Sequence, residues 1–318
     1  MSIKIRKSGI LTTVQDLGRT RFRRFSINPG GVMDAAAARL INILLENDEN
    51  EAVIEMHFPA AEIAFEENAL FAVGGADFAA ELDDKKVDNW RIHFAEKQSV
   101  LRFPQKISGN RAYFSIKGGF EIEKWLGSAG TNLKAKIGGV EGRPLKPGDE
   151  LFFRQTTKEG ARQTNFKISG SLIPFYSRFP TVRVVAGAEF ELLSTSGYKH
   201  FLEETFVISQ NSDRMGFRLE GKPIRLSEIK EIVSSAVNYG TIQLLPDGQV
   251  IVLMADHQTS GGYPRIANVI STDLPLLGQL GANEKVAFHL VSLEEAENLS
   301  FEFEKNLNLL KIAVNLTK

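Results

Sequence analysis

A dense group of polar residues follows an apolar run in the last quarter of the chain. Val250–Ala255 is apolar, and the next residues, Asp256 to Pro264, read DHQTSGGYP. Carboxylate, imidazole, amide and hydroxyl groups at the end of a rigid strand can hold a small polar substrate. Adjacent glycines, here Gly261 and Gly262, allow close approaches that other residues cannot make. A well-satisfied turn explains the same residues, so the pattern alone leaves both interpretations open.

Earlier polar blocks could contribute to the same chemistry. The block GILTTVQDLGR ends at Arg19 and could form a pocket wall, or an edge strand that satisfies its own polar groups. Lys117 stands directly before a Gly-Gly pair at the end of a predicted strand, where it could pair with an oxyanion or simply face solvent. Asp213 and Arg214 are adjacent in a predicted turn, where they could act on a substrate or form an ion pair with each other.

Several kinds of site are disfavoured. No phosphate loop of the form GxxxxGKS or GxxxxGKT occurs, no GxGxxG precedes a helix, and there is no GxSxG elbow. The chain has no cysteine, which excludes disulfides, thiolate metal sites and a cysteine nucleophile. The histidines show no ligand spacing, so we expect no metal centre; they are His57, His93, His200, His257 and His289.

The composition is typical of a globular protein of about two domains. The 318 residues include 38 basic and 39 acidic side chains, so no overall field attracts nucleic acid or an anionic membrane. Four arginines gather in Arg19–Arg24, which fits a solvated loop or contact with an anion or an acidic partner. The first residues lack the apolar core of a signal peptide and no run is long enough to span a bilayer, so we expect a cytoplasmic protein.

Short β-rich runs dominate, and Gly, Pro, Asp and Asn bound them, as in antiparallel proteins. The clearest predicted hairpin is Thr241–Met254, in which Pro246-Asp247-Gly248 supplies the turn. The sequence predicts strands at Ala112–Ile116, Glu150–Arg154, Thr181–Val185, Thr205–Ile208, Thr241–Leu245, Gln249–Met254 and Lys285–Leu290.

Few helices are expected. Asp34 can N-cap a helix over Ala35–Leu45, in which Leu40, Ile41, Leu44 and Leu45 form one apolar stripe. Ser292 has capping-box spacing to Glu295 and predicts a short C-terminal helix. Asp273, which precedes Leu274-Pro275, predicts another helix start.

The chain resembles itself on either side of Thr156–Ser171, a stretch rich in Thr, Lys, Gly, Gln and Ser that fits a linker. Ala112–Phe120 and Val250–Tyr263 each run from a strand into a Gly-Gly pair, at an offset of about 140 residues. We therefore expect a diverged tandem pair of β subdomains, at residues 1–160 with an N-terminal extension and at residues 161–318.

Taken in order, these blocks resemble the carboxyltransferase A/B-type proteins, also described as allophanate hydrolase subunit 2-like proteins or the KipA family. The matching stretches are GILTTVQDLGR with PGGVMD, SDRMGFRLEG, GTIQ with PDGQ, and MADHQTSGGYP, and the resemblance covers roughly Gly9–Leu293. It implies a mainly β protein with two tandem cyclophilin-like β-barrel subdomains and a few short helices. Departures from the family pattern at Glu46, Val250 and Gly281–Glu284 fall in turns.

The resemblance also implies a function. Free bacterial members usually serve as the C-type subunit of an ATP-dependent 5-oxoprolinase, which opens 5-oxoproline to glutamate with a KipI-like B-type subunit and a LamB/YcsF-like A-type subunit. The chain shows no biotin carboxylase segment, which favours that context over a carboxyltransferase that acts on a urea-like amide with biotin supplied in trans. A third alternative is a binding protein that antagonises a KipI-like kinase inhibitor. Which of the proteins binds ATP, and whether the chain self-associates, stay open.

Under this interpretation the polar blocks supply the site. Asp256, Asp213 and Gln258 are the predicted catalytic residues, because carboxylates can accept a proton or hold an amide N–H, and an amide can donate to a developing oxyanion. His257 lies at a position that varies in the family, which weakens it as a catalytic base. The predicted substrate-binding residues are donors, an aromatic wall and cations: Thr259, Gly261, Gly262, Tyr263, Arg214, Arg19 and Lys117.

Overall fold

The computed structural model describes residues 1–154, 166–228 and 232–316, and its chain divides into two compact units. Unit 1 consists of Met1–Arg19, Gly30–Phe175 and Lys305–Lys318, and unit 2 consists of Thr20–Pro29 and Tyr176–Glu304. The predicted boundary between two subdomains, at residues 160 and 161, lies outside the described residues and stays a prediction.

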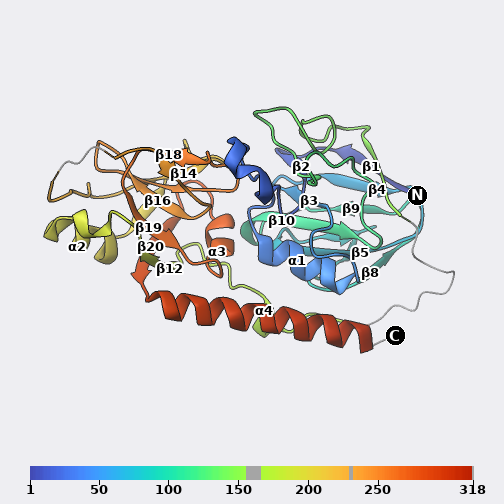
Figure 1. The fold of residues 1–318 in the computed structure, drawn as a ribbon. Helices are drawn as coiled ribbons and strands as arrows, with labels where there is room; N and C mark the ends of the chain where they lie inside the picture. The colour runs from blue at the N-terminus through green and yellow to red at the C-terminus, as the bar shows by residue number, and fades with distance from the viewer. Residues whose placement is uncertain (155–165, 229–231, 317–318) are drawn as a thin grey trace. The chain divides into compact units, whose positions relative to one another are not determined.

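Within the described residues, unit 1 is built from a six-stranded sheet of order β11-β1-β4-β9-β6-β7 and a five-stranded sheet of order β2-β3-β10-β5-β8 (Figure 1). All the pairings within these sheets are antiparallel. The strands are β1 (Ser2–Lys7), β2 (Thr12–Gln15), β3 (Val53–Met56), β4 (Glu62–Phe65), β5 (Ala69–Asp77), β6 (Glu81–Leu82), β7 (Lys85–Lys86), β8 (His93–Ala95), β9 (Val100–Arg102), β10 (Ser108–Ile116) and β11 (Glu150–Phe152).

The core of unit 1 lies between these two sheets. Side chains along a strand point alternately to its two faces, so Phe114 of β10 enters the core while its neighbours Tyr113 and Ser115 face the other way. In the core, the Phe114 ring lies 5.7 Å from the ring of Phe71, which in turn lies 5.2 Å from the ring of Phe65. The opposite face of β10 is therefore polar, although its side chains are equally buried.

Helix α1 (Ala35–Leu44) lies against β5 and β10 (Figure 1). The Asp34 side chain caps it by accepting from the Ala37 amide at 2.8 Å, which confirms the predicted helix start. The helix packs directly on the backbone of β5, because a Cβ atom at Gly74 would lie only 2.6 Å from Cγ2 of Ile41. Glycine at position 74 thus sets the distance between helix and sheet.

A closed barrel forms the centre of unit 2, with the strand order β12-β19-β16-β17-β14-β13-β20. The barrel closes where β12 and β20 pair in parallel, and its other pairings are antiparallel. The barrel strands are β12 (Thr181–Ala186), β13 (Phe206–Ile208), β14 (Gly216–Glu220), β16 (Thr241–Leu244), β17 (Val250–Leu253), β19 (Arg265–Val269) and β20 (Lys285–Leu290), and β15 (Ser235–Ala236) pairs separately with β18 (Ser260–Gly261).

The predicted strands are confirmed, since each overlaps an observed one, although β10 begins at Ser108 rather than at Ala112. The predicted hairpin is the β16–β17 pair. Its turn closes through Gly248, which adopts a φ of 84° and donates to the carbonyl of Leu245 at 3.0 Å. The fold is therefore mainly β, as the sequence predicts.

Helices are few among the described residues, but the last one is not short. Helix α4 (Leu293–Leu316) has 24 residues, where the sequence predicts a short helix starting at Ser292. The predicted start is correct, because the Ser292 hydroxyl accepts from the Glu295 amide at 3.1 Å. The other helical segments are α2 (Thr195–Glu203), α3 (Leu274–Gly278), η1 (Thr20–Phe25), η2 (Gly170–Leu172) and η3 (Phe190–Leu192).

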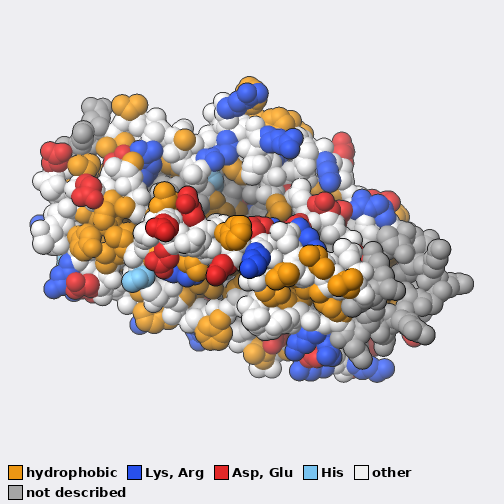
Figure 2. Space-filling view, turned by 60° about the horizontal axis from the view of Figure 1, so that its bottom comes forward, with side chains coloured by type: hydrophobic (Ala, Val, Ile, Leu, Met, Phe, Trp, Pro, Cys, Tyr) orange, Lys and Arg blue, Asp and Glu red, His pale blue; other side chains and the backbone are white. Residues whose placement is uncertain are grey.

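The second half of α4 carries apolar side chains on two opposite faces. Leu307, Leu310 and Val314 are buried, whereas Leu309 and Ile312 are more than half exposed. Figure 2 shows hydrophobic side chains lying among acidic and basic ones on the face that carries this helix. No helix in the described ranges is long and apolar enough to cross a membrane.

The predicted start of α3 is also correct, but Asp273 does not cap it with its side chain. Its carboxylate instead accepts from Arg183, from the backbone amide at 2.8 Å and from Nη2 of the guanidinium at 2.6 Å. Because a charged, two-pronged donor is a stronger partner than a single helix amide, this ion pair takes the carboxylate away from the helix.

Candidate functional site

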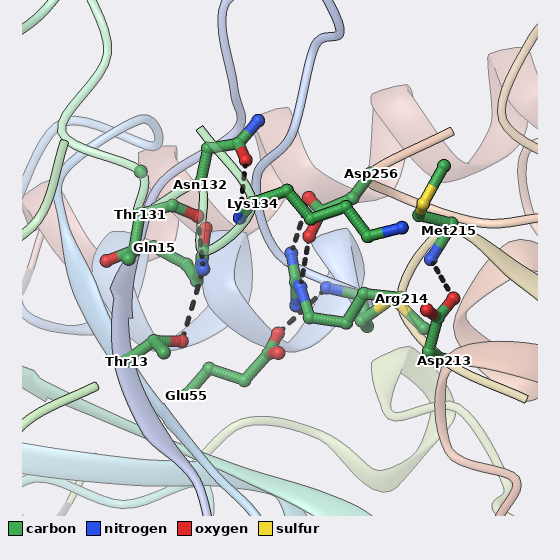
Figure 3. Close-up of polar contacts among 12 residues, drawn as sticks. Thr13, Gln15, Glu55, Thr131, Asn132, Lys134, Asp213, Arg214, Met215 and Asp256 are labelled. Carbon is green, nitrogen blue, oxygen red and sulfur yellow. Dashed lines mark hydrogen bonds and ion pairs between the residues drawn. The ribbon is translucent and has the colours of Figure 1, made fainter. Parts of the chain in front are cut away.

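Arg214 and Asp256 form a two-pronged ion pair in unit 2 (Figure 3). Nε of Arg214 lies 2.9 Å from Oδ2 of Asp256, and Nη2 lies 3.3 Å from Oδ1. The side chains are only 9% and 12% exposed. Strand pairing brings them together, because Arg214 precedes β14, Asp256 follows β17, and Gly216 of β14 pairs with Leu253 of β17.

The sequence offered an ion pair between the neighbours Asp213 and Arg214 as one of two interpretations. In the structure each has a different partner. Oδ1 of Asp213 accepts from the amides of Met215 at 2.7 Å and Gly216 at 3.3 Å, so this oxygen holds the turn before β14. Asp213 is exposed, whereas Arg214 is buried. The backbone bends at Arg214 and Met215, and the guanidinium of Arg214 pairs with the carboxylate of Asp256 instead.

The residues after Asp256 form a turn that leads into β18. His257 Nδ1 lies 2.5 Å from the carbonyl oxygen of Gln258, and the carbonyl of Thr259 accepts from the amide of Val237 at 3.2 Å. Gly261 lies in β18, where it pairs with Ser235 of β15. Backbone contacts at Thr259 and Gly261 therefore hold this turn against the segment 235–237.

Gly261 is required for a close approach and not for an unusual backbone angle, because its φ is outside the left-handed region. A Cβ atom here would lie 2.7 Å from Nε2 of Gln243 in β16. Gln243 is 1% exposed, and its Nε2 donates to the carbonyl of Tyr263 at 3.5 Å. Its Oε1 is buried and has no hydrogen-bond partner among the described residues.

The other two predicted residues of this stretch, Gly262 and Tyr263, lie at the surface. Tyr263 is 45% exposed, and Gly262 is also exposed. Sequence analysis missed Gln243, although it stands in GTIQ, one of the stretches that carried the resemblance. Only the barrel pairing, which places β16 beside both β17 and β19, brings this amide beneath Gly261.

A segment from the beginning of the chain completes this region of unit 2. Thr20–Pro29, here called the arm, belongs to unit 2 although Arg19 before it and Gly30 after it belong to unit 1. From the arm, Arg23 donates through Nη2 to the carbonyl of Val237, and Asn28 donates through Nδ2 to the carbonyl of Asp256 at 3.2 Å. These arm residues were not predicted as site residues, since nothing in their local sequence shows a contact more than 200 positions away.

His257 is almost fully buried, at 1% exposure. Burial lowers the pKa of its imidazole below the ordinary value of 6.5, and the charge of Arg23 lowers it further, against opposing effects of the Gln258 carbonyl and Asp256. The folded protein therefore keeps His257 neutral at pH values at which an exposed histidine takes up a proton.

This histidine should make the protein less stable as the pH falls. Below about pH 6.5 the unfolded chain binds a proton at His257 that the folded chain binds only at lower pH, so the free energy of unfolding decreases as pH drops from about 6.5 towards the lowered pKa. The check is urea unfolding at about pH 7.5 and about pH 5.5 for the wild type and His257→Gln. The variant should lose less stability between the two pH values; equal losses would contradict the prediction.

The predicted residues Arg19 and Lys117 lie in unit 1 and have local partners there. Arg19 is 2% exposed, donates to the carbonyl of Gly130 and places its guanidinium carbon 5.2 Å from the centre of the Trp125 ring. Nζ of Lys117 lies 2.8 Å from Oε1 of Glu46. The structure thus assigns these two cations to a different unit from Arg214, Asp256 and the residues that follow Asp256.

Unit 1 has its own buried polar layer, on the sheet face opposite the core. Gln15 is fully buried and donates through Nε2 to Oγ1 of Thr13 and the carbonyl of Thr131, both at 3.1 Å (Figure 3). Asp16 accepts from the hydroxyl of Ser128 at 2.6 Å. Several polar groups of GILTTVQDLGR thus have partners in unit 1, whereas Oε1 of Gln15 is buried without a hydrogen-bond partner among the described residues, so both sequence interpretations of this block stay predictions.

Glu55 and Tyr113 form the centre of this layer. Glu55 Oε2 accepts from the Tyr113 hydroxyl and from the Met33 amide, both at 2.8 Å, and the Tyr113 oxygen accepts from the Asp34 amide at 2.9 Å. Burial raises the pKa of Tyr113 well above its ordinary value. The pair thereby fixes the loop that precedes α1. In the described part of the chain, no three His, Asp or Glu side chains are grouped so that they could hold a metal ion.

Comparisons with known proteins identify the family. Residues 25–290 match the model of the carboxyltransferase domain, subdomains A and B. The chain is 37% identical to the C-type subunit of 5-oxoprolinase from Haemophilus influenzae over 304 residues, 95% of this chain and 96% of that protein. It is 36% identical to the corresponding 5-oxoprolinase subunit from Escherichia coli over 298 residues, 92% of this chain and 93% of that protein.

A solved structure agrees with this assignment. The crystal structure of the K. lactis urea amidolyase matches with a TM-score of 0.90 and 25% identity, over 97% of this chain but only 20% of that protein. The same domain thus occurs both as a separate chain and as a fifth of a much longer one. This chain belongs to the carboxyltransferase domain family with subdomains A and B.

Proposed function

We propose that this chain is the C-type subunit of an ATP-dependent 5-oxoprolinase, which converts 5-oxoproline, ATP and water to glutamate, ADP and phosphate. One observation carries the proposal. The sequence similarity to two proteins named as this 5-oxoprolinase subunit extends, in each comparison, over at least 92% of this chain and at least 93% of the relative. The urea amidolyase of Saccharomyces cerevisiae, in contrast, is matched over only 17% of its length.

The chemistry fits the polar residues at the end of β17. A lactam resists hydrolysis because amide resonance stabilises its carbonyl, and ATP supplies the activation by phosphorylating the amide oxygen. The chain's own donors would then stabilise the developing negative charge. In our proposal Gln258, Thr259 and the backbone of Gly261 and Gly262 surround the lactam, and the exposed ring of Tyr263 forms one wall.

Within this proposal Asp256 accepts the lactam N–H. Its ion pair with Arg214 fixes the direction of the carboxylate, and a carboxylate has lone pairs beyond the two that Arg214 uses. Asp213 is a second candidate acid or base through Oδ2, since Oδ1 is occupied by the turn amides. Arg19 and Lys117 stay predicted substrate-binding residues.

The proposal includes partner proteins. We propose a KipI-like B-type subunit and a LamB/YcsF-like A-type subunit, because the relatives' name designates one component of a multi-protein enzyme. The deciding experiment mixes the three purified proteins with 5-oxoproline and ATP, and measures both glutamate formation and ADP release. We expect turnover only in the complete mixture. Glutamate formation at an equal rate without this chain would refute the proposal.

A carboxyltransferase function is the second candidate, and the match to urea amidolyase over 97% of this chain favours it. In that case the substrate would be urea or a related amide, and the carboxyl group would come from carboxybiotin supplied in trans. The two functions separate on one readout: incorporation of labelled bicarbonate into urea in the presence of a biotin carboxylase and a biotin carrier. We expect no incorporation by the complex that forms glutamate.

A further inference from the structure

A site for 5-oxoproline needs a cation, because this substrate carries a carboxylate beside its lactam ring. The three cations predicted from the sequence already have partners. Arg214 pairs with Asp256, Lys117 pairs with Glu46, and Arg19 lies against Trp125 in unit 1. A cation that no carboxylate neutralises, beside the polar turn of unit 2, would serve this role directly.

Arg23 of the arm has the properties of such a cation. It is only partly exposed, and its Nη2 donates to the carbonyl of Val237. Its Nε is buried and has no hydrogen-bond partner, and no carboxylate forms an ion pair with it, in the ranges that the structure describes. A buried N–H without an acceptor costs free energy, so the unpartnered Nε favours binding of an anion by this guanidinium.

The surroundings of Arg23 place it beside the predicted lactam site. Val237, which accepts from Arg23, donates its own amide to the carbonyl of Thr259. The charge of Arg23 is close enough to His257 to act on that imidazole. Hydrogen bonds through Val237 therefore connect Arg23 to the turn after Asp256.

Two further polar atoms nearby are buried and lack hydrogen-bond partners among the described residues: Oγ of Ser235 and Oε1 of Gln243. Ser235 pairs with Gly261 across β15 and β18, and Gly261 in turn lies directly over Gln243. Buried polar groups are nearly always hydrogen-bonded in folded proteins. This group of atoms therefore marks a polar region that a bound molecule would complete.

We infer that Arg23 binds the carboxylate of the substrate while the turn after Asp256 holds its amide group. The inference rests on the proposed function and makes it specific: the site selects an amide that carries a carboxylate, such as 5-oxoproline, over neutral amides such as 2-pyrrolidinone or urea. Arg23 is well suited to this role, because a guanidinium offers several donors in a planar fork that matches a carboxylate.

The test is Arg23→Gln in the complete complex of three proteins, with KM and kcat measured for 5-oxoproline. We expect KM to rise about 10- to 100-fold with little change in kcat, as for loss of a charge-assisted hydrogen bond to bound substrate. Inhibition by 2-pyrrolidinone, which lacks the carboxylate, should be unchanged. Arg23→Lys keeps the charge without the fork and should fall between wild type and Arg23→Gln.

Arg24→Gln is the matched control, because Arg24 is exposed and its guanidinium lies 4.8 Å from the Phe25 ring. This variant should behave as wild type. A KM for Arg23→Gln within about twofold of wild type would overturn the inference while leaving the function intact. So would a parallel loss of 2-pyrrolidinone binding, because it would show that Arg23 only holds the arm in place. A wild-type complex without turnover would overturn the function and the inference together.

Discussion

Asp256→Ala is expected to lower the free energy of unfolding by about 3–5 kcal/mol, because the buried guanidinium of Arg214 loses the two-pronged ion pair with Asp256. That loss is large beside the total stability of about 5–15 kcal/mol that is typical of a folded domain. Urea unfolding followed by circular dichroism measures it. The variant's turnover is to be compared at equal folded fractions, so that a role in chemistry is separated from the loss of stability.

The matching double variant removes both charges at once. Arg214→Met with Asp256→Leu removes both charges of this pair and should recover most of the stability that Asp256→Ala loses. Glu220→Ala serves as the control, since Glu220 is exposed in the neighbouring strand β14 and should change stability by no more than about 0.5 kcal/mol. A loss below about 1 kcal/mol for Asp256→Ala would show that the pair does not stabilise unit 2.

Glu55→Ala should destabilise unit 1 by about 2–6 kcal/mol. The Tyr113 hydroxyl and the Met33 amide both lose the buried acceptor, and each such loss costs about 1–3 kcal/mol. Tryptophan fluorescence during urea unfolding is the appropriate measurement, because both tryptophans of the chain, Trp90 and Trp125, belong to unit 1.

Graded variants test the same network. Tyr113→Phe removes only the hydroxyl and should cost about 1–3 kcal/mol, less than Glu55→Ala. Glu96→Ala removes an exposed carboxylate from the same unit and should stay within about 0.5 kcal/mol of wild type. If Glu55→Ala were no more harmful than Glu96→Ala, the buried polar layer would not stabilise unit 1.

Local rules predicted the elements whose causes are local. The hairpin of β16 and β17 follows from a Pro-Asp-Gly turn between two apolar runs, and α1 follows from the cap at Asp34. The length of α4 was underestimated, because its three buried side chains begin only at Leu307, far beyond the cap at Ser292. Stability supplied by tertiary packing leaves little trace in the amphipathic pattern of the first turns.

The site was predictable as a set of residue types but not as a set of contacts. Asp256 and Arg214 were both proposed, yet the pairing across 42 positions depends on the register of β14 and β17. Arg23 and Val237 are 214 positions apart, so no local pattern could join them. The adjacency of Asp213 and Arg214 was misleading for the same reason: Asp213 accepts from the amides of its own turn, whereas Arg214 pairs with Asp256.

The closure of the barrel has a consequence for biosynthesis. Strand β20 pairs with both β12 and β13, so those strands keep open edges until residue 290 has left the ribosome. At about 5–20 residues per second, translation from β12 to β20 takes roughly 5–20 seconds. Throughout that interval the nascent chain exposes edges able to pair with other chains, and the arm, made long before, has no finished barrel to bind. Unit 2 should therefore need chaperone protection during translation, up to the synthesis of its final strand.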